Sequence, residues 1–230
     1  MKTTGGSDEQ KQRAGEKAVE YVNDGDIVGL GTGSTAATAI DALGDAVTAG
    51  YDIRGVPTSL ATRDRAIEQG IPLTQIEAVD QIDIAIDGAD QVDNESTLIK
   101  GGGAAHAREK VIDAIADQFI VVADTSKLVE TVSEPIPVSV LPMAQTPVKR
   151  HLESLGATPT LRSADRKDGP VITDNGNLVF DCAFGSIEDA ESVSQSLAGI
   201  PGVVAHGLFV DLADIVCVGT EDGVDIYPKE

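Results

Sequence analysis

The stretch Asp26-Ile27-Val28-Gly29-Leu30-Gly31-Thr32-Gly33-Ser34-Thr35 sets the pattern that most of this chain repeats. Its first half is a short apolar run of the kind that forms a buried strand, and its second half is rich in glycine and hydroxyl groups. We therefore expect a strand over 26–30, a tight loop over 31–35 and a helix directly after the loop. A strand, a loop and a helix in this order are typical of an α/β fold.

The same alternation extends to both sides of this stretch. Ser7 and Gln10 resemble a capping box and predict a helix that reaches about residue 22. Further along, the pattern predicts strands near 52–56, 82–86 and 119–123, a helix from Ser59 to about Gly70, and a helix from the glycines after Lys100 to about residue 117. Alternating strands and helices imply a mostly parallel sheet, with ligands bound at the carboxyl ends of its strands.

From about residue 134 the order of elements changes. The pattern predicts a strand over 136–141, a helix over 147–155, a strand over 158–162, a turn-linked pair around 174–177, a helix over 187–198 and a strand over 203–209. This is the β-α-β-β-α-β order of ferredoxin-like units. A last apolar strand over 215–218 is expected to return to the first sheet. We therefore expect one domain over 1–130 with 208–230, and an inserted α+β domain over 131–207.

The composition excludes several classes of partner. The 230 residues include 17 Lys and Arg against 38 Asp and Glu, for a net charge of −21. Nucleic acids and anionic membranes both require a basic face, so neither is an expected partner. The acidic residues are scattered along the chain, which suggests a solvated acidic surface. A salt-rich cytoplasm would explain that surface, and an ordinary acidic protein is the alternative.

The cellular compartment is also suggested by the sequence. Cys182 and Cys217 are far apart and lack the spacing of metal ligands, which favours buried thiols in a reducing compartment. The N-terminal segment has no apolar core like that of a signal peptide, and no segment approaches the length of a membrane span. We therefore expect a cytoplasmic location.

The loop over 31–35 is the first candidate site. Its backbone N–H groups and the following helix N-terminus can hold a phosphate. Gly31, Gly33 and Ala36 also fit a dinucleotide-binding pattern, with Asp52 as its acidic residue, but Asp52 would begin its strand rather than end it. A purely structural tight turn is the third interpretation.

Four further candidates lie after predicted strands or in the helix expected after Lys100. Asp87 and Asp90 lie three residues apart where a buried strand ends. This pair can be interpreted either as part of a turn or as a site of proton transfer. The three glycines after Lys100 allow a ligand to approach the backbone closely. Glu109, taken alone, fits an exposed charged surface better than a site, and no set of ligands accompanies His106 for a metal. Lys127 places a second cation at a strand end, which an anionic substrate would need in so acidic a chain.

Six segments in order resemble type A ribose-5-phosphate isomerases: GTGSTA (31–36), DGAD (87–90), IKGGGAAHAREK (99–110), ADTSK (123–127), ITDNGN (172–177) and IPGVVAHGLF (200–209). The resemblance implies a Rossmann-like, mostly parallel sheet with an inserted ferredoxin-like α+β domain. It also implies interconversion of ribose 5-phosphate and ribulose 5-phosphate in the non-oxidative pentose phosphate pathway, without cofactor or metal, by a homodimer or homotetramer.

The resemblance further implies roles for single residues. Glu109 would be the proton acceptor, Asp87 would assist opening of the sugar ring, and Lys100 would stabilise the enediolate. Lys11 also matches a lysine near the site, in a less specific segment. The residues expected to bind the substrate are Thr32, Gly33, Ser34, Thr35, Asp87, Gly88, Ala89, Asp90, Lys100, Gly101, Gly102, Gly103 and Lys127.

The sequence departs from the family pattern at two positions, and two other kinds of function compete with the isomerase interpretation. Gln91 stands where many relatives have Glu, and His106 replaces an apolar residue, so the pH dependence is open. A sugar-phosphate-sensing regulatory domain would require an attached DNA-binding segment. A deaminating isomerase or an acyl-CoA transferase would need different catalytic groups.

Overall fold

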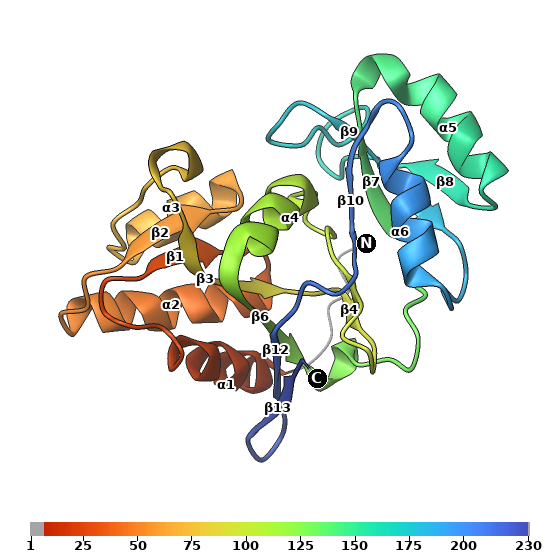
Figure 1. Ribbon diagram of the computed structural model, residues 1–230. Helices are drawn as coiled ribbons and strands as arrows, with labels where there is room; N and C mark the ends of the chain where they lie inside the picture. Colours follow the sequence, from red (N-terminus) through yellow and green to blue (C-terminus); the bar gives the residue numbers. More distant parts are fainter. Residues whose placement is uncertain (1–6, 230) are drawn as a thin grey trace. The chain divides into compact units, whose positions relative to one another are not determined.

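The computed structural model describes residues 7–229, which form two compact units (Figure 1). The larger unit contains residues 7–89, Val111–Leu128 and 212–229, and the smaller unit contains Asp90–Lys110 and Val129–Asp211. The domain limits expected from the sequence stay a prediction. Within the described part of the chain, no helix is long and apolar enough to cross a membrane.

The larger unit is built on a six-stranded sheet with the order β13-β12-β6-β3-β1-β2. All neighbouring pairs are parallel except β12 and β13, which are antiparallel. The sheet confirms the alternation predicted from the sequence and the return of the last apolar strand to the first sheet. Its strands are β1 (Ile27–Leu30), β2 (Arg54–Pro57), β3 (Ile82–Gly88), β6 (Ala116–Asp124), β12 (Ile215–Gly219) and β13 (Val224–Pro228).

The helices of this unit bury their apolar faces. Helix α1 begins after the predicted capping box, in which Ser7 and Gln10 satisfy each other's backbone N–H groups. It packs on α2 so closely that a Cβ at Gly15 would lie 2.3 Å from Thr38 Oγ1. The helices are α1 (Asp8–Val19), α2 (Ser34–Thr48), α3 (Leu60–Glu68) and α4 (His106–Ile115), whose first turn belongs to the smaller unit, with short 3₁₀ turns η1 (Ile76–Ala78) and η2 (Thr125–Lys127).

The smaller unit contains a four-stranded antiparallel sheet with the order β10-β7-β9-β8. Numbered along the chain, these strands lie in the order 4-1-3-2, with α5 and α6 as connections, which is the predicted ferredoxin-like pattern. The elements are β7 (Ile136–Val140), η3 (Pro142–Ala144), α5 (Gln145–Ser154), β8 (Thr158–Leu161), β9 (Leu178–Ala183), α6 (Ala190–Ala198) and β10 (Val203–His206). A small sheet, β11-β5-β4, adds β4 (Gln91–Val92), β5 (Leu98–Ile99) and β11 (Leu208–Phe209).

The structure corrects three predicted elements. The helix expected from residue 187 begins at Ala190, because the Asp189 side chain accepts a hydrogen bond from the Ser192 N–H and caps it there. The strand expected over 203–209 is split at Gly207 between two sheets. Of the pair around 174–177, only the second arm is a full strand, and the first makes an isolated bridge at Ile172.

A fourth correction concerns the chain after Lys100. The three glycines do not open a helix, since α4 begins only at His106. Gly101 and Ala104 have φ values of +102° and +62°, which lie in the left-handed region and are incompatible with helix. The segment over 101–105 is therefore a loop.

The two cysteines, Cys182 and Cys217, are buried as predicted and carry free thiols.

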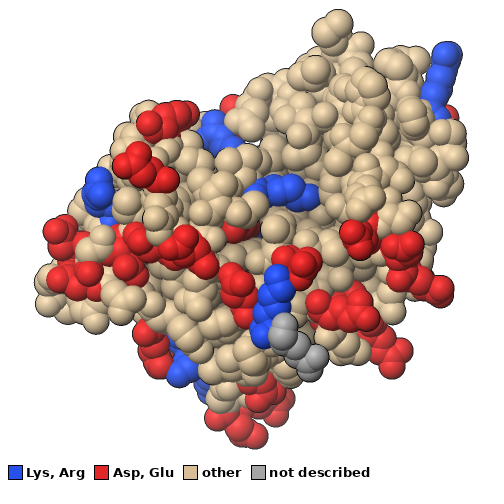
Figure 2. Space-filling model, viewed as in Figure 1, with Lys and Arg blue, Asp and Glu red and all other residues tan. Residues whose placement is uncertain are grey.

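Acidic side chains gather over the lower half of the face drawn in Figure 2, where they outnumber the basic ones. Because screening relieves repulsion among like charges, we expect KCl to raise the unfolding temperature of this −21 chain. Between 0.1 and 2 M KCl the rise should be roughly 5 °C or more, about 1–2 kcal/mol for a chain of this size. Thermal unfolding monitored by circular dichroism, with sucrose as the uncharged control, measures it. A midpoint that does not move with KCl would favour an ordinary acidic protein.

Candidate functional site

The predicted loop over 31–35 connects β1 to α2 in the larger unit. The Gly31 N–H donates to the Ile86 carbonyl at 3.0 Å, which ties the loop to β3. Gly33, at the N-cap of α2, has φ of +136°, and neither a side-chain cap nor an acidic residue occupies the first turn. The Ser34 side chain is exposed. A helix N-terminus without a capping side chain is suited to binding an anion.

Asp87 is fully buried and holds this loop in place. Its Oδ1 accepts hydrogen bonds from the Thr32 N–H at 2.9 Å and the Gly88 N–H at 2.6 Å. A Cβ at Gly31 would lie 2.2 Å from the same oxygen, so only glycine allows the carboxylate so near. Ala89 follows in the half-buried end of this segment. The carboxylate of Asp87 is therefore not that of an exposed turn.

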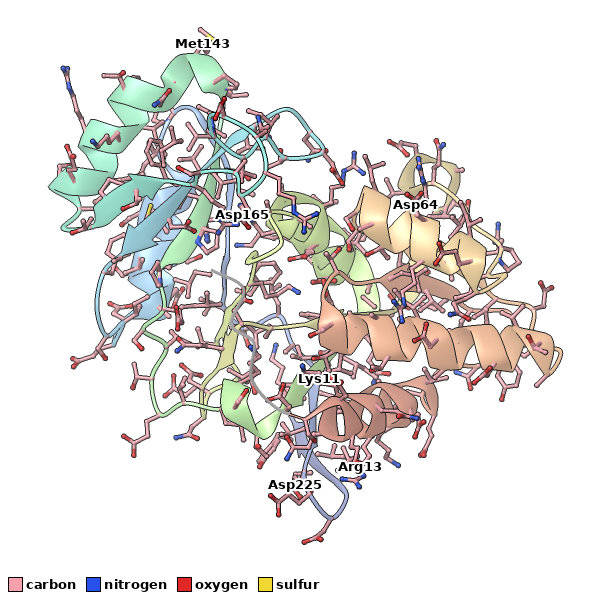
Figure 3. The ribbon with its side chains drawn as sticks, turned by 180° about the vertical axis from the view of Figure 1, so that it is seen from behind. Lys11, Arg13, Asp64, Met143, Asp165 and Asp225 are labelled. Atoms are coloured by element: carbon pink, nitrogen blue, oxygen red, sulfur yellow. The ribbon has the colours of Figure 1, made fainter. Side chains whose placement is uncertain are left out.

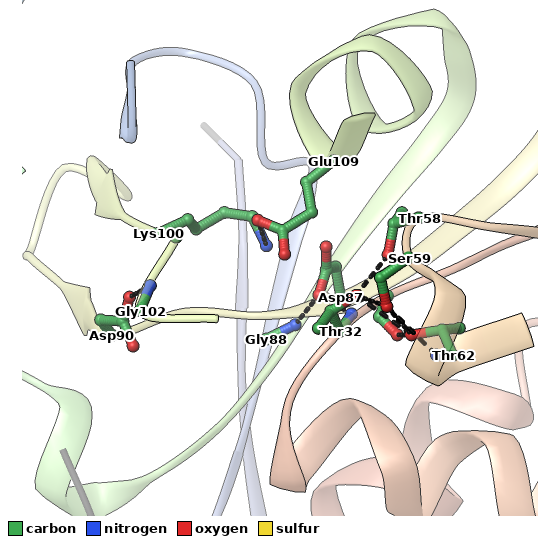
Figure 4. Close-up of polar contacts among 12 residues, drawn as sticks. Thr32, Thr58, Ser59, Thr62, Asp87, Gly88, Asp90, Lys100, Gly102 and Glu109 are labelled. Atoms are coloured by element: carbon green, nitrogen blue, oxygen red, sulfur yellow. Dashed lines mark hydrogen bonds and ion pairs between the residues drawn. The ribbon is translucent and has the colours of Figure 1, made fainter. Parts of the chain in front are cut away.

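A cluster of hydroxyl groups surrounds Thr32 (Figure 4). Thr32 Oγ1 lies 2.8 Å from Thr58 Oγ1, 2.8 Å from Ser59 Oγ and 3.0 Å from Thr62 Oγ1. Thr62 in turn donates to the Gly31 carbonyl at 2.8 Å. The sequence prediction assigned no role to Thr58, Ser59 and Thr62, although a run of hydroxyl residues after a strand and at the N-terminus of α3 was a signal for it.

Two further predicted residues of the larger unit are buried or shielded. Lys127 is 7% exposed and ends the 3₁₀ turn η2, which follows β6 and is capped by Asp124. Thr35 is also buried, in the first turn of α2. Lys11 lies on α1 (Figure 3), where its Nζ is 3.9 Å from Asp8 Oδ1.

Lys100 and Glu109 form a buried ion pair in the smaller unit. Their side chains are 1% and 3% exposed, and Lys100 Nζ lies 3.6 Å from Glu109 Oε2 (Figure 4). The ammonium of Lys100 also lies 5.4 Å from the centre of the Phe209 ring, within range of a cation–π interaction. The interpretation of Glu109 as part of an exposed surface is therefore wrong. A buried carboxylate beside a buried ammonium is an arrangement able to exchange protons and to stabilise negative charge.

The glycine loop after Lys100 is fixed by bonds from outside it. The Lys100 N–H donates to the Gly207 carbonyl at 2.8 Å, and the Gly102 N–H donates to Asp90 Oδ2 at 2.8 Å. A Cβ at Gly101 would lie 2.6 Å from the ring of His106, so the imidazole occupies the space that a side chain would need. His106 is fully buried, and its Nε2 lies 2.9 Å from Ser139 Oγ.

Burial changes the protonation of three groups near this loop. It lowers the pKa of His106 to about 3, and the charges of Arg162 and Lys110 act in the same direction. Burial likewise lowers the pKa of His206 to about 3 and that of Lys110 to about 7. Lys110 Nζ donates to the Leu208 carbonyl at 2.8 Å and lies 3.2 Å from His206 Nδ1. Both histidines are therefore neutral at physiological pH.

These pKa values predict how stability depends on pH. An unfolded histidine has a pKa near 6.5, so below that pH the unfolded state binds protons that the folded His106 and His206 do not. The free energy of unfolding should be highest above pH 6.5 and fall by about 2 kcal/mol per histidine between pH 7 and pH 5. Urea unfolding across this range should show a loss about half as large in His206→Asn. The exposed His151→Asn is the control, and equal losses in His206→Asn and the wild type would contradict the account.

Among the described residues, no group of three or more His, Cys, Asp or Glu side chains is arranged to hold a metal ion. The predicted residues thus lie in two clusters. Thr32 to Thr35, Asp87 to Ala89 and Lys127 belong to the larger unit, and Asp90, Lys100 to Gly103 and Glu109 belong to the smaller one.

A sequence model of a protein family, described as ribose 5-phosphate isomerase A or phosphoriboisomerase A, matches residues 54–223. The chain belongs to the ribose 5-phosphate isomerase A family. A family member from Haloquadratum walsbyi is 80% identical over 99% of this chain and 96% of its own length. A relative of the same name from Natronomonas pharaonis is 58% identical over 98% of this chain and all of its own length.

Solved structures of the family share the fold. Ribose 5-phosphate isomerase A from Methanocaldococcus jannaschii is 43% identical and matches 95% of this chain and 98% of its own, with a TM-score of 0.92. A D-ribose-5-phosphate isomerase in complex with phospho-erythronic acid is also 43% identical, covers 97% of this chain and 100% of its own, and has a TM-score of 0.94. The expected α/β fold, with a mostly parallel sheet, is confirmed.

Proposed function

We propose that this chain interconverts D-ribose 5-phosphate and D-ribulose 5-phosphate through an enediolate. Membership of the ribose 5-phosphate isomerase A family supports the reaction. The single structural observation that carries it is the buried pair of Lys100 and Glu109, 3.6 Å apart beside a loop of three glycines. A carboxylate base and a cation are the two groups that isomerisation through an enediolate requires.

Glu109 acts as the base in this proposal. Its carboxylate removes the proton from C2 of the open-chain aldose, and the electron pair of that bond forms the enediolate. Glu109, which exchanges the captured proton with water in part of the turnovers, then protonates C1, while the hydroxyl proton of O2 passes to O1 and the ketose carbonyl forms at C2. The ammonium of Lys100 offsets the negative charge that develops on the oxygens. Burial strengthens this interaction because little water screens it.

Asp87 assists the step before isomerisation in this proposal. The sugar phosphate exists mainly as a ring, so a proton must move between the ring oxygen and the anomeric hydroxyl before C2 is accessible. Asp87 is buried, and its Oδ1 is held by two backbone N–H groups, which keeps the carboxylate in one position. A fixed carboxylate is suited to relaying that proton.

We assign the phosphate group to the larger unit. The first turn of α2 has no capping side chain, and the loop before it is held by Asp87 and the hydroxyl cluster around Thr32. Lys127 would add a positive charge, as the resemblance implies. The binding set of the proposal is otherwise the one expected from the sequence, including Asp90 and the glycines after Lys100.

The nature of the ligand is supported by a relative. Phospho-erythronic acid, bound by the family member described above, is a phosphorylated sugar acid. Its planar carboxylate carries two oxygens that share a negative charge, and the enediolate likewise presents two oxygens in one plane, one on each of its two carbons. A site that binds such a molecule is suited to the phosphate and to the charge of the intermediate.

We also propose that the chain is a cytoplasmic homodimer or homotetramer whose partner is a small sugar phosphate, with no nucleic-acid or membrane partner. The net charge of −21 supports the absence of nucleic acid and anionic membranes among its partners. Light scattering coupled to gel filtration measures the number of chains in the assembly.

Ketose formation from ribose 5-phosphate tests the proposed function. Purified chain in 2 M KCl with EDTA should produce ribulose 5-phosphate, and phospho-erythronic acid should inhibit competitively. Ribose without its phosphate is the control substrate and should react far more slowly. Binding of ribose 5-phosphate without ketose formation would instead favour a sugar-phosphate-sensing domain.

A further inference from the structure

Arg162 connects the antiparallel sheet of the smaller unit to the glycine loop of the same unit. It follows β8 directly, and its backbone is fixed on both sides. Its N–H donates to the Val179 carbonyl at 2.9 Å, and its carbonyl accepts from the Val171 N–H at 2.9 Å. The side chain is only 13% exposed. The guanidinium therefore starts from a rigid base.

The guanidinium of Arg162 donates hydrogen bonds from two of its edges, one to a carboxylate and one to the glycine loop. Nε and Nη2 donate to the two carboxylate oxygens of Asp181 on β9, with Nε at 2.9 Å. Nη1 donates to the carbonyl of Gly101 at 2.9 Å and to that of Gly102 at 3.2 Å. The paired contact with Asp181 sets the plane of the guanidinium, and that plane determines where Nη1 points.

Fixing these two carbonyls also fixes two N–H groups. A peptide unit is planar and trans, so its C=O and N–H point in opposite directions. The Gly101 carbonyl shares a peptide with the Gly102 N–H, which donates to Asp90, and the Gly102 carbonyl shares one with the Gly103 N–H. Among residues 7–229, the Gly103 N–H donates to no acceptor. A cation on a peptide oxygen also polarises the peptide, which strengthens its N–H as a donor.

The loop needs such external support. Three successive glycines have no side chains with which to pack, and glycine has the largest conformational freedom of any residue. Gly101 has a φ of +102° and its carbonyl accepts a hydrogen bond from the Ala104 N–H within the loop, while the other contacts of the loop and of Lys100 before it come from Asp90, His106, Gly207 and Arg162. Of these residues, Arg162 donates hydrogen bonds to the carbonyls of both Gly101 and Gly102.

We propose that Arg162 is a positioning residue for the isomerisation: by holding the Gly101 and Gly102 carbonyls, it fixes and polarises the Gly103 N–H as a donor to the oxyanion of the enediolate. The inference rests on the proposed function. Arg162 acts through the loop, because its guanidinium donates to Asp181 and to the two carbonyls.

Arg162→Gln and Arg162→Lys test the proposal, with the exposed Arg150→Gln as the matched control in the same unit. We expect kcat to fall about 10- to 100-fold in Arg162→Gln, since a preorganised oxyanion donor contributes about 10²–10³-fold and here it is displaced rather than removed. KM should change less than about threefold. The inhibition constant of phospho-erythronic acid should rise by about the same factor as kcat falls, while that of inorganic phosphate stays unchanged.

The two inhibitors separate positioning from general disruption. A merely structural role would weaken inorganic phosphate and phospho-erythronic acid alike, or lower the unfolding temperature without changing kcat of the folded enzyme. If Arg162→Gln does not fold, Arg162→Lys keeps the charge but loses the paired contact, and should lose about tenfold in kcat. A folded variant that keeps kcat and both inhibition constants within about threefold overturns the proposal. An inactive wild type would refute the proposed function instead.

Discussion

Glu109→Gln is expected to lower kcat for ribose 5-phosphate by at least about 10²–10⁴-fold, because glutamine cannot accept the C2 proton. KM should change little, since glutamine has nearly the size of glutamate and the other groups of the site are unaltered. Initial rates of ketose formation across substrate concentrations measure both constants. Glu153→Gln is the matched control, because Glu153 is exposed on α5 in an ion pair with Lys149.

The same substitution has a cost in stability that must be separated from its effect on chemistry. Removing one partner of a buried ion pair leaves the Lys100 ammonium buried beside a neutral amide, which destabilises a fold by about 3–5 kcal/mol in comparable cases. Circular dichroism and the binding of inorganic phosphate show whether the variant is folded. A folded Glu109→Gln that retains wild-type kcat would remove Glu109 from its proposed role.

Gly31→Ala is expected to abolish most activity and to destabilise the larger unit. The new Cβ would lie 2.2 Å from Asp87 Oδ1 and 2.5 Å from Asp87 Cα, so β1 or β3 would have to move. Overpacking of this kind costs about 1–3 kcal/mol and occasionally more. Because Asp87 also holds the Thr32 N–H, we expect kcat/KM to fall by at least about tenfold in the molecules that remain folded.

Urea unfolding and steady-state kinetics on the same preparation measure both effects. Gly223→Ala is the control in the same unit, since a Cβ there would meet nothing within 4 Å. Equal stability and equal kcat/KM in Gly31→Ala and Gly223→Ala would show that the close approach of the loop to Asp87 is not required.

The sequence predicted the parallel sheet well because its central strands are buried on both faces. The run over 119–123 is continuously apolar and that over 82–86 is interrupted only by Asp83, and turn residues follow both, so the strand and its polar carboxyl end are visible in the sequence. The β13 strand was missed for the opposite reason. It lies at the sheet edge with mostly exposed residues, so no apolar run marks it.

The loop after Lys100 was predicted as a helix start because glycines and a cation before an amphipathic segment resemble one. Its observed shape depends on contacts distant in sequence, such as Arg162, 61 positions beyond Gly101. Local propensity contains no information about such contacts. For the same reason the burial of Glu109, flanked by two charged residues, was not evident from its neighbours.

The predicted site residues were identified through a family resemblance more than through residue chemistry. Each motif alone admitted a structural interpretation, and only the order of the segments favoured one reaction. The hydroxyl cluster of Thr58, Ser59 and Thr62 was missed because its function is to hold Thr32, which depends on the fold and not on the local pattern.

Solvent-deuterium incorporation tests the central claim, a carboxylate-mediated proton transfer through an enediolate, most directly. The wild-type chain would be incubated with ribose 5-phosphate in D₂O containing KCl and EDTA, and the sugars examined by proton NMR over many turnovers. The account predicts ribulose 5-phosphate carrying deuterium at C1 and recovered ribose 5-phosphate carrying deuterium at C2. Ketose that forms without deuterium after many turnovers would indicate direct hydride transfer and would contradict the account.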